Sequence, residues 1–322
     1  MVRPMSINLE LPVPAELGGQ RVDQVAAELF SEYSRAMHAA WIQQGDLTVD
    51  GKAVKPKTRL FGGERLRLVT VLSARQDWQT AQDVPFEVVY EDEFLLVVDK
   101  PVGIVMHPGA GNPDGTLVNG LLRYRESLSS LPRAGIIHRL DKNTSGLLLV
   151  AATLPAQQVL TRALTAREIE RRYLAVTEGC LITGRDIDLP LGRDPHNRTK
   201  QTVREDGRTA LTRVRVRERF RAHSLIEAEL ATGRTHQIRV HLANIGYPLV
   251  GDRRYGARGK LPPAADHKLI AALQAYGHQA LHAYRLVLDH PKTAVRLTFE
   301  APIHKHMGEL VSLLREDVGS TG

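Results

Sequence analysis

The chain has 322 residues, of which 43% are hydrophobic and 25% charged, and its formal net charge is +7. This length suits two domains, one small and one large, and the composition is that of an ordinary globular protein. The chain lacks an apolar stretch long enough to span a bilayer, its first ten residues lack the apolar core of a signal peptide, and its single cysteine cannot form an internal disulfide, so we expect a cytoplasmic protein without membrane contact.

Positive charge is concentrated in the middle of the chain. Residues 133–221 hold 18 basic and 10 acidic side chains, whereas residues 76–132 hold 3 basic and 9 acidic ones. A concentrated basic region favours a polyanion such as a nucleic acid as partner. A solvated surface with surplus arginine explains the same counts equally well, so charge alone leaves both interpretations open.

Residues 21–45 have the apolar spacing of two short helices. Ser34 is of the residue type that caps the start of a helix, and Gly45 is expected to end the second helix. Asp50 and Gly51 form a dipeptide typical of a tight hairpin turn. The region is therefore expected to fold as two helices followed by two strands, and to end near residue 72.

These patterns divide the chain into four segments. Residues 1–18 are expected to be an N-terminal extension and residues 19–75 a small domain. Residues 76–85 are polar and unpatterned, which is typical of a linker between domains. Residues 86–322 are expected to form the larger domain.

The larger domain has more strand patterns than helix patterns, and its strands often follow one another directly. Strands are expected on both sides of an acidic turn near residue 92 and at 145–153, 173–176, 213–217 and 224–230, and helices after Pro155 and after the N-cap Thr235. This order predicts an α+β fold around a mainly antiparallel mixed sheet.

Several kinds of site are absent from the sequence. Thirteen histidines suggest a metal, but the chain contains neither HExxH nor CxxC. His236 and His241 are five residues apart, which places them on different faces of a helix. The loop at 109–115 (GAGNPDG) lacks the Gly-Lys-Ser/Thr ending of a P-loop. We therefore expect no metal and no nucleotide cofactor.

The most informative segment is GIIHRLDKNTSGLLLVA at residues 135–151, where Arg139 and Asp141 lie between two apolar runs. Residue chemistry alone favours an ordinary turn, in which Asp141 caps the turn that ends at Ser145 and Arg139 forms an ion pair at the surface.

The same segment resembles the signature of the RluA-type family of pseudouridine synthases, HRLDKxTSGLLLVA. Three more segments resemble family motifs in the expected order, namely DKPVGIVMHP at 99–108, REIERRYLAVTEG at 167–179 and TGRTHQIRVHL at 232–242. The match covers roughly residues 86–305, although it is loose at 185–210. The N-terminal unit resembles an S4 RNA-binding domain.

The resemblance implies an RNA isomerase that converts uridine to pseudouridine without a cofactor, with Asp141 as its catalytic residue. It further implies that Arg234 pairs with the Asp141 carboxylate and that Tyr173 stacks against the target uracil. Arg139 would help to extrude the base and hold its phosphate. Whether the carboxylate adds to C1′ of the ribose or removes a sugar proton to give a glycal stays open.

The resemblance also implies substrate-binding and RNA-binding residues outside these motif centres. In the DKPVGIVMHP segment, Lys100 and His107 are expected to bind substrate. In the S4-like domain, the expected RNA-binding residues are Arg21, Ser34, Arg35 and Lys52. Modules of this kind read RNA shape and backbone more than sequence.

The segment HPGAGNPDGTLVNGLL at 107–122 resembles family members that modify large-subunit ribosomal RNA. The partner is therefore expected to be 23S ribosomal RNA or the assembling large subunit, with a helix 69 stem-loop as target, and the enzyme to be a monomer. Two alternatives remain open: the same enzyme acting on another RNA, such as transfer RNA, and a non-catalytic assembly factor. The intact HRLD sequence and Tyr173 argue against the assembly factor.

Overall fold

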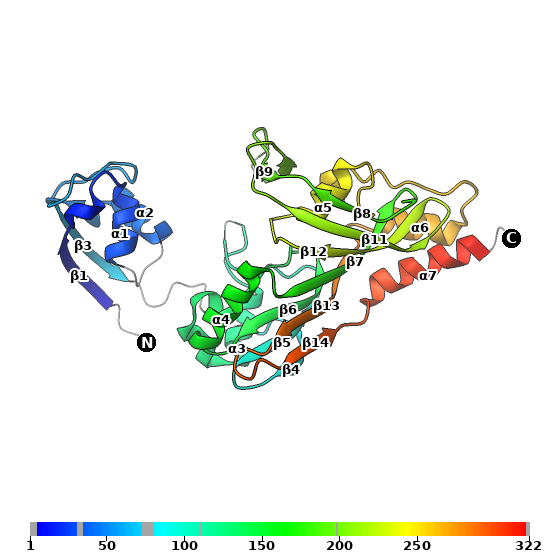
Figure 1. The fold of residues 1–322 in the computed structure, drawn as a ribbon, viewed down its shortest axis with the longest axis horizontal. Helices are drawn as coiled ribbons and strands as arrows, with labels where there is room; N and C mark the ends of the chain where they lie inside the picture. Colours follow the sequence, from blue (N-terminus) through cyan, green and yellow to red (C-terminus); the bar gives the residue numbers. More distant parts are fainter. Residues whose placement is uncertain (1–4, 31–34, 73–79, 110, 198, 320–322) are drawn as a thin grey trace. The chain divides into compact units, whose positions relative to one another are not determined.

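The computed structural model describes residues 5–30, 35–72, 80–109, 111–197 and 199–319 (Figure 1). Its internal contacts divide the chain into two compact units, Met1–Asp77 and Trp78–Gly322. Within the described part of the chain, no helix is both long and apolar enough to cross a membrane.

The smaller unit combines two helices with a three-stranded antiparallel sheet in the order β1-β3-β2. Its elements are β1 (Met5–Pro12), η1 (Ala15–Leu17), α1 (Val22–Leu29), α2 (Arg35–Gln44), β2 (Leu47–Val49) and β3 (Arg65–Leu72). Val25 of α1, Ile42 of α2 and Leu66 of β3 share one buried core. Asp50 and Gly51 both have positive φ values, 48° and 74°, as a two-residue type I′ turn requires. The helices and the turn predicted for this region are therefore present.

The boundaries of the two units differ from the prediction. Residues 5–18, the described part of the predicted extension, are not separate from the smaller unit, because β1 pairs with β3 over the whole length of β1. The predicted linker partly belongs to the larger unit, since the Gln82 amide donates to the Asn119 carbonyl (3.1 Å) and its side chain accepts from the Gly115 amide (2.7 Å). Ser34, the predicted N-cap, lies outside the described residues.

The larger unit is built on a nine-stranded sheet in the order β4-β5-β6-β13-β7-β12-β11-β8, with β14 paired to β13. The strands are β4 (Glu87–Glu91), β5 (Leu95–Lys100), β6 (Ser145–Ala151), β7 (Glu170–Glu178), β8 (Arg185–Asp188), β11 (Leu211–Arg219), β12 (His223–Leu230), β13 (Leu281–Asp289) and β14 (Arg296–Glu300). The pairing of β13 with β6 is parallel, and the other pairings in this sheet are antiparallel. The predicted α+β fold with a mainly antiparallel mixed sheet is confirmed for this unit.

α-Helices and short 3₁₀ helices, labelled η, surround this sheet (Figure 1). They are α3 (Leu117–Tyr124), η3 (Glu126–Ser130), η4 (Pro132–Gly135), α4 (Leu154–Ala166), α5 (Gln237–Asn244), η5 (Arg253–Tyr255), α6 (His267–Ala275) and α7 (Lys305–Gly319). A separate two-stranded hairpin is formed by β9 (Leu191–Arg193) and β10 (Gln201–Val203).

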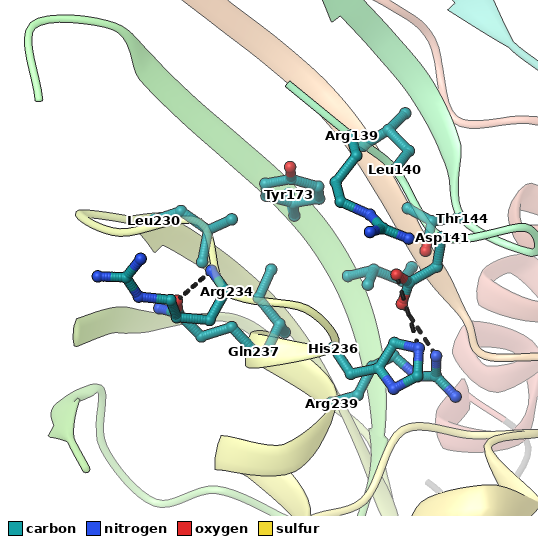
Figure 2. A pocket seen from close by; sticks show the side chains of 12 residues that line it. Arg139, Leu140, Asp141, Thr144, Tyr173, Leu230, Arg234, His236, Gln237 and Arg239 are labelled. Carbon is teal, nitrogen blue, oxygen red and sulfur yellow. Dashed lines mark hydrogen bonds and ion pairs between the residues drawn. The ribbon is translucent and has the colours of Figure 1, made fainter. Parts of the chain in front are cut away.

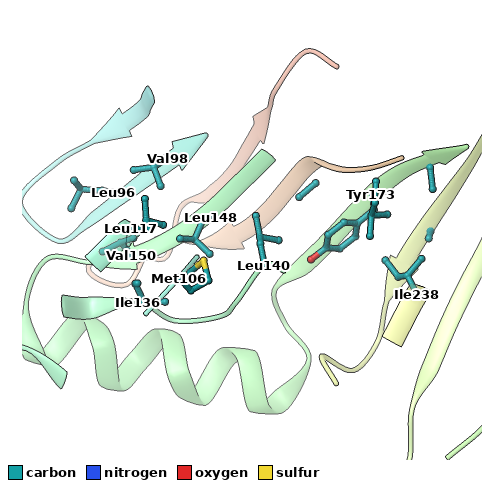
Figure 3. Packing of buried hydrophobic residues seen from close by; sticks show 14 of the residues in the cluster. Leu96, Val98, Met106, Leu117, Ile136, Leu140, Leu148, Val150, Tyr173 and Ile238 are labelled. Atoms are coloured by element: carbon teal, nitrogen blue, oxygen red, sulfur yellow. The ribbon is translucent and has the colours of Figure 1, made fainter. Parts of the chain in front are cut away.

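Strands β5 and β6 are buried on both faces because helices cover each side of the sheet. Leu96 and Leu148 lie in the core that contains Leu117 of α3 (Figure 3). Leu95, the neighbour of Leu96, lies in the opposite core with Leu160 of α4. Successive side chains of a strand alternate between its faces. A strand covered on both sides therefore reads as the continuous apolar run seen in the sequence.

The parallel contact between β6 and β13 positions the loop that carries Asp141. Gly146 lies at this contact with a φ of 109°, and a Cβ there would lie 2.2 Å from the Ala283 carbonyl oxygen. Glycine lets the two strands meet directly after the loop. Because Ala283 of β13 also pairs with Tyr173 of β7, the arrangement brings the Asp141 loop close to Tyr173.

Candidate active site

A small pocket lies between the loop that precedes β6, strand β7 and the start of α5 (Figure 2). Its volume is about 50 Å³. The residues that line it are Arg139, Leu140, Asp141, Thr144, Tyr173, Leu230, Arg234, His236, Gln237, Ile238, Arg239 and Leu281. The three residues predicted to be catalytic, and the predicted base-extruding arginine, are therefore brought together here.

A chain of charged hydrogen bonds fixes the Asp141 carboxylate. Arg239 of α5 donates from one terminal nitrogen to Asp141 Oδ2 at 2.9 Å. Through Nε and its other terminal nitrogen, the same guanidinium binds both oxygens of Asp252, at 2.7 and 2.9 Å. The side chains of Asp252, Arg239 and Asp141 are 2%, 7% and 15% exposed. This series of hydrogen bonds therefore runs from the interior of the larger unit to the pocket.

Arg239 remains a cation in this setting. Burial acts to lower the pKa of Arg239, but the hydrogen bonds that it donates to Asp252 and the charges of Asp252 and Asp141 outweigh this effect, and the net pKa lies above that of a free guanidinium. A planar guanidinium that binds one carboxylate bidentately and a second through its remaining N–H has a defined orientation. Asp141 therefore has a fixed counter-charge on one oxygen.

The predicted partner of Asp141, Arg234, is not its partner. Arg234 lines the pocket, but its Nε donates to the Thr209 carbonyl at 3.2 Å. The reason is where the helix begins: the cap is His236 in the left-handed conformation, with φ 59°, rather than Thr235. The first turn of α5 therefore carries Arg239 to the carboxylate. The sequence feature that could have pointed to Arg239 is its position between two apolar residues. This position predicts a buried arginine, and a buried arginine requires an acidic partner.

Lys100 does not line the pocket, contrary to its predicted contact with substrate. Its side chain is 0% exposed, and its ammonium donates to the carbonyls of Pro101, Ile104 and Lys142 at 2.8 to 3.1 Å. Burial lowers the pKa of Lys100 to about 7, opposed by the charges of Asp141 and Asp99. An ammonium has three donors, and all three are used. Lys100 therefore ties the loop after β5 to the residue that follows Asp141.

The other predicted pocket residues differ in their surroundings. Tyr173 is 4% exposed, and burial raises its pKa to about 12, so the phenol is neutral. Arg139 is exposed at the edge of the pocket. His107 is not among the lining residues; burial, together with the charges of Arg133 and Arg139, lowers its pKa to about 4. The contact of His107 with substrate stays a prediction.

Part of the basic charge in the middle of the chain is paired within the protein. On the outer face of β11, Arg213 binds Glu229 at 2.9 Å and Arg217 binds Glu227. Arg172 of β7 lies between these glutamates, 3.6 Å from Glu227 and 3.5 Å from Glu229. Two arginines of β11 are therefore paired, whereas Arg215 and Arg219 are exposed and form no ion pair among the described residues.

The RNA-binding residues predicted in the smaller unit are only partly described. The Arg21 guanidinium donates two hydrogen bonds to Asp23, at 3.0 and 2.9 Å, and so is engaged within the protein. Lys52 is exposed. Ser34 and the side chain of Arg35 lie outside the described residues.

The sequence did not point to two further residues at the pocket. His236 Nε2 lies 3.8 Å from Asp141 Oδ1, and its Nδ1 is 2.6 Å from the Tyr255 hydroxyl. Arg239 lies over the Tyr255 ring, 5.0 Å from the centroid. Within the described residues, no three histidine, cysteine or acidic side chains are grouped as a metal site.

Comparisons with known proteins agree with the motifs. Residues 94–244 match the model of the RNA pseudouridylate synthase family. The chain is 50% identical, over 95% of both chains, to ribosomal large subunit pseudouridine synthase D of Pseudomonas aeruginosa. It is 49% identical to the protein of the same name from Xanthomonas campestris, over 95% of this chain and 92% of the relative. The corresponding Yersinia pestis protein is 45% identical, over 97% and 96%.

Solved structures share the fold at lower identity. Human RNA pseudouridylate synthase domain containing 4 is 22% identical and superposes with a TM-score of 0.56, over 71% of this chain and 93% of that chain. Human RNA pseudouridylate synthase domain containing 1 is 23% identical, with a TM-score of 0.53, over 73% and 96%.

Replacing each of the two pocket arginines separates their roles. Arg239→Gln is expected to lower the free energy of unfolding of the larger unit by about 3 kcal/mol, because it leaves the Asp252 carboxylate buried without its cation. Arg234→Gln is expected to lower it by less than about 1 kcal/mol, because Arg234 is half-buried and forms no ion pair with a carboxylate among the described residues. Denaturant unfolding of both variants measures the difference. Equal losses would contradict the assignment of the ion pair to Arg239.

His138, the first residue of the HRLD sequence, is buried, and its Nε2 accepts a hydrogen bond from the Leu149 amide at 3.2 Å. Burial, with a smaller effect of Arg171, lowers the pKa of His138 from 6.5 to about 3. Between these values the unfolded chain binds a proton that the folded protein does not. Stability is therefore lost as the pH falls from about 6.5 towards 3.

His138→Gln keeps an acceptor at this position and removes the titration. We expect the free energy of unfolding of the wild type to fall by about 1 kcal/mol more than that of the variant between pH 6.5 and 5.5. Urea unfolding of both proteins at these two pH values measures the difference. The same pH dependence in both proteins would show that His138 is not responsible.

Proposed function

The chain belongs to the RNA pseudouridine synthases, which are isomerases, and on that basis we propose that it converts uridines of large-subunit ribosomal RNA to pseudouridine with Asp141 as the catalytic carboxylate. The observation that carries this proposal is the pocket itself: among the described residues that line it, Asp141 is the only carboxylate. The relatives matched along nearly their whole length carry the large ribosomal subunit in their names.

The proposed reaction exchanges one bond to the ribose for another. The N1–C1′ bond of the uridine breaks, the uracil turns within the pocket, and a C5–C1′ bond forms. C5 then loses its proton to solvent, and N1 gains one. The atoms and charges balance without an oxidant, a phosphate donor or water as a reactant, so the proposed reaction needs no cofactor.

The Asp141 carboxylate can start this sequence in two ways. One of its oxygens can add to C1′ as uracil leaves, giving a covalent ester, or it can remove the C2′ proton to give a glycal. Both routes use a free oxygen of an ionised carboxylate. Arg239 binds Oδ2 at 2.9 Å, and Oδ1 accepts no hydrogen bond from the described residues, which supports either route.

The remaining pocket residues suit the handling of a flipped base. The neutral Tyr173 ring provides a flat, buried surface for stacking on uracil. Arg139, exposed at the edge, would help to extrude the base and would hold a phosphate of its strand. Flipping costs a few kcal/mol of stacking, which contacts with the RNA backbone can offset.

Cations that form no ion pair among the described residues would hold the RNA. Arg253 and Arg254 of η5 are exposed beside Tyr255, close to the pocket. In the smaller unit the proposed S4-like surface carries exposed cations on one loop, namely Lys52, Lys55, Lys57 and Arg59. Such a surface reads backbone and shape. A helix 69 stem-loop of 23S ribosomal RNA is the proposed target.

Release of tritium from RNA labelled at C5 of uridine tests this proposal, because C5 loses its hydrogen only when it bonds to C1′. We expect the wild type to release tritium from large-subunit ribosomal RNA or from assembling large subunits, without added metal or cofactor. Asp141→Asn, which keeps the side-chain shape, should reduce release to background. Asp186→Asn, which changes an exposed carboxylate of the same unit, should leave it unchanged.

Wild-type rates in Asp141→Asn would contradict the catalytic role of this residue. Release from transfer RNA but not from either form of the large-subunit substrate would contradict the proposed substrate. Comparing a helix 69 transcript with other fragments of the same ribosomal RNA tests the proposed target separately.

A further inference from the structure

His236 lies beside Arg239 and close to the proposed catalytic carboxylate. Figure 2 shows its ring directed at Asp141, with Nε2 3.8 Å from Oδ1. His236 caps the start of α5 with a positive φ of 59°, a backbone conformation that is uncommon outside glycine. Such a conformation persists where surrounding contacts hold it, and it is enriched at functional sites.

The contacts of the second ring nitrogen of His236 favour one tautomer. Nδ1 lies 2.6 Å from the Tyr255 hydroxyl, and that hydroxyl accepts a hydrogen bond from the Gln201 amide at 2.9 Å. The Tyr255 oxygen has its acceptor role filled by the amide, so its own proton can point at Nδ1. The His236 proton then sits on Nε2 and faces the Asp141 carboxylate. The opposite tautomer would direct a lone pair at a negative charge.

The charges around His236 favour a neutral ring. Burial lowers the pKa of His236, and the cations of Arg239 and Arg254 lower it further, against the charges of Asp141 and Asp252. Burial also raises the pKa of Tyr255, which keeps its hydroxyl protonated. The ring is therefore a neutral donor towards Asp141 rather than a second cation.

The two oxygens of Asp141 thus face different donors. Oδ2 accepts a formed hydrogen bond from Arg239, whereas the 3.8 Å to His236 Nε2 exceeds hydrogen-bond length. Bonds to reacting groups are often long before substrate binds and shorten in the complex. A small rotation of the carboxylate about its Arg239 contact brings Oδ1 within reach of the imidazole.

We propose that His236 is a positioning residue, whose Nε2–H, kept on that nitrogen by Tyr255, orients Oδ1 of Asp141 towards the ribose. This inference rests on the proposed catalytic role of Asp141. The carboxylate would then be held at both oxygens, by a cation at one and by a neutral donor at the other. Because the His236 imidazole is neutral, it does not offset the negative charge of Oδ1, which stays available for reaction.

Single-turnover kinetics of His236→Ala, His236→Gln and Tyr255→Phe on C5-labelled ribosomal RNA test this role. His236→Ala should slow the reaction by about 10- to 100-fold, the range expected when a reacting group loses its orientation. The affinity for RNA should not change, because His236 acts through Asp141. His236→Gln should recover most of the rate, since its amide places an N–H close to the position of Nε2.

Tyr255→Phe keeps the ring beneath Arg239 and removes only the hydroxyl that sets the tautomer, so its rate should lie between those of the wild type and His236→Ala. Tyr284→Phe is the matched control: it removes a hydroxyl that donates to the buried Glu227, away from the pocket lining, and should keep the wild-type rate. Thermal unfolding of each variant shows whether it is folded, and Tyr255→Phe decides the question if His236→Ala is not.

Two results would overturn the proposal. One is a wild-type rate in His236→Ala or, where that variant does not fold, in Tyr255→Phe. The other is an equal loss in folded His236→Ala and His236→Gln, which would mean that an N–H at this position is not what matters. Failure of the proposed function is distinguishable from both, because it appears as tritium release that survives Asp141→Asn.

Discussion

A guanidinium buried between two carboxylates holds the pocket together. Arg239 links the loop before β6, which carries Asp141, to the first turn of α5 and to Asp252 after that helix. Burying charge is costly, and a buried group of ions such as Asp252, Arg239 and Asp141 is stable only when each ion keeps its partners. These contacts therefore hold the Asp141 carboxylate in place as soon as the larger unit has folded. The set carries one net negative charge, and the nearby Lys100 ammonium, bound to three carbonyls around the same loop, partly offsets it.

Ion pairing also decides which cations are available to RNA. The middle of the chain carries a large basic excess, yet Arg213 and Arg217 of β11 are paired with Glu229 and Glu227 of β12. Other arginines of this region, such as Arg139 and Arg215, are exposed and form no ion pair among the described residues. Net charge alone therefore overstates the number of cations that are free to bind a polyanion.

The sequence was sufficient to predict the features that depend on a local pattern or on a family motif. The apolar run of β6 indicated a strand, Asp50-Gly51 indicated its turn, and four motifs identified the family and the position of Asp141. Non-local pairing was out of reach, so β1 was taken for an extension although it completes the small sheet. The prediction that Arg234 pairs with Asp141 failed because it depended on where α5 begins. The helix begins after a histidine in the left-handed conformation, which is too uncommon outside glycine to be predicted from the sequence.

The claim that Arg239 acts by fixing Asp141 is tested most directly by the rate of pseudouridine formation in Asp252→Asn under single-turnover conditions. This change leaves the pocket lining intact and removes the charge that orients Arg239 from behind. Asp317→Asn, which alters a similarly buried carboxylate paired with Arg221, is the control. The account predicts a loss of about 10-fold or more in Asp252→Asn, with RNA affinity unchanged and the control at the wild-type rate. A wild-type rate in folded Asp252→Asn would contradict it.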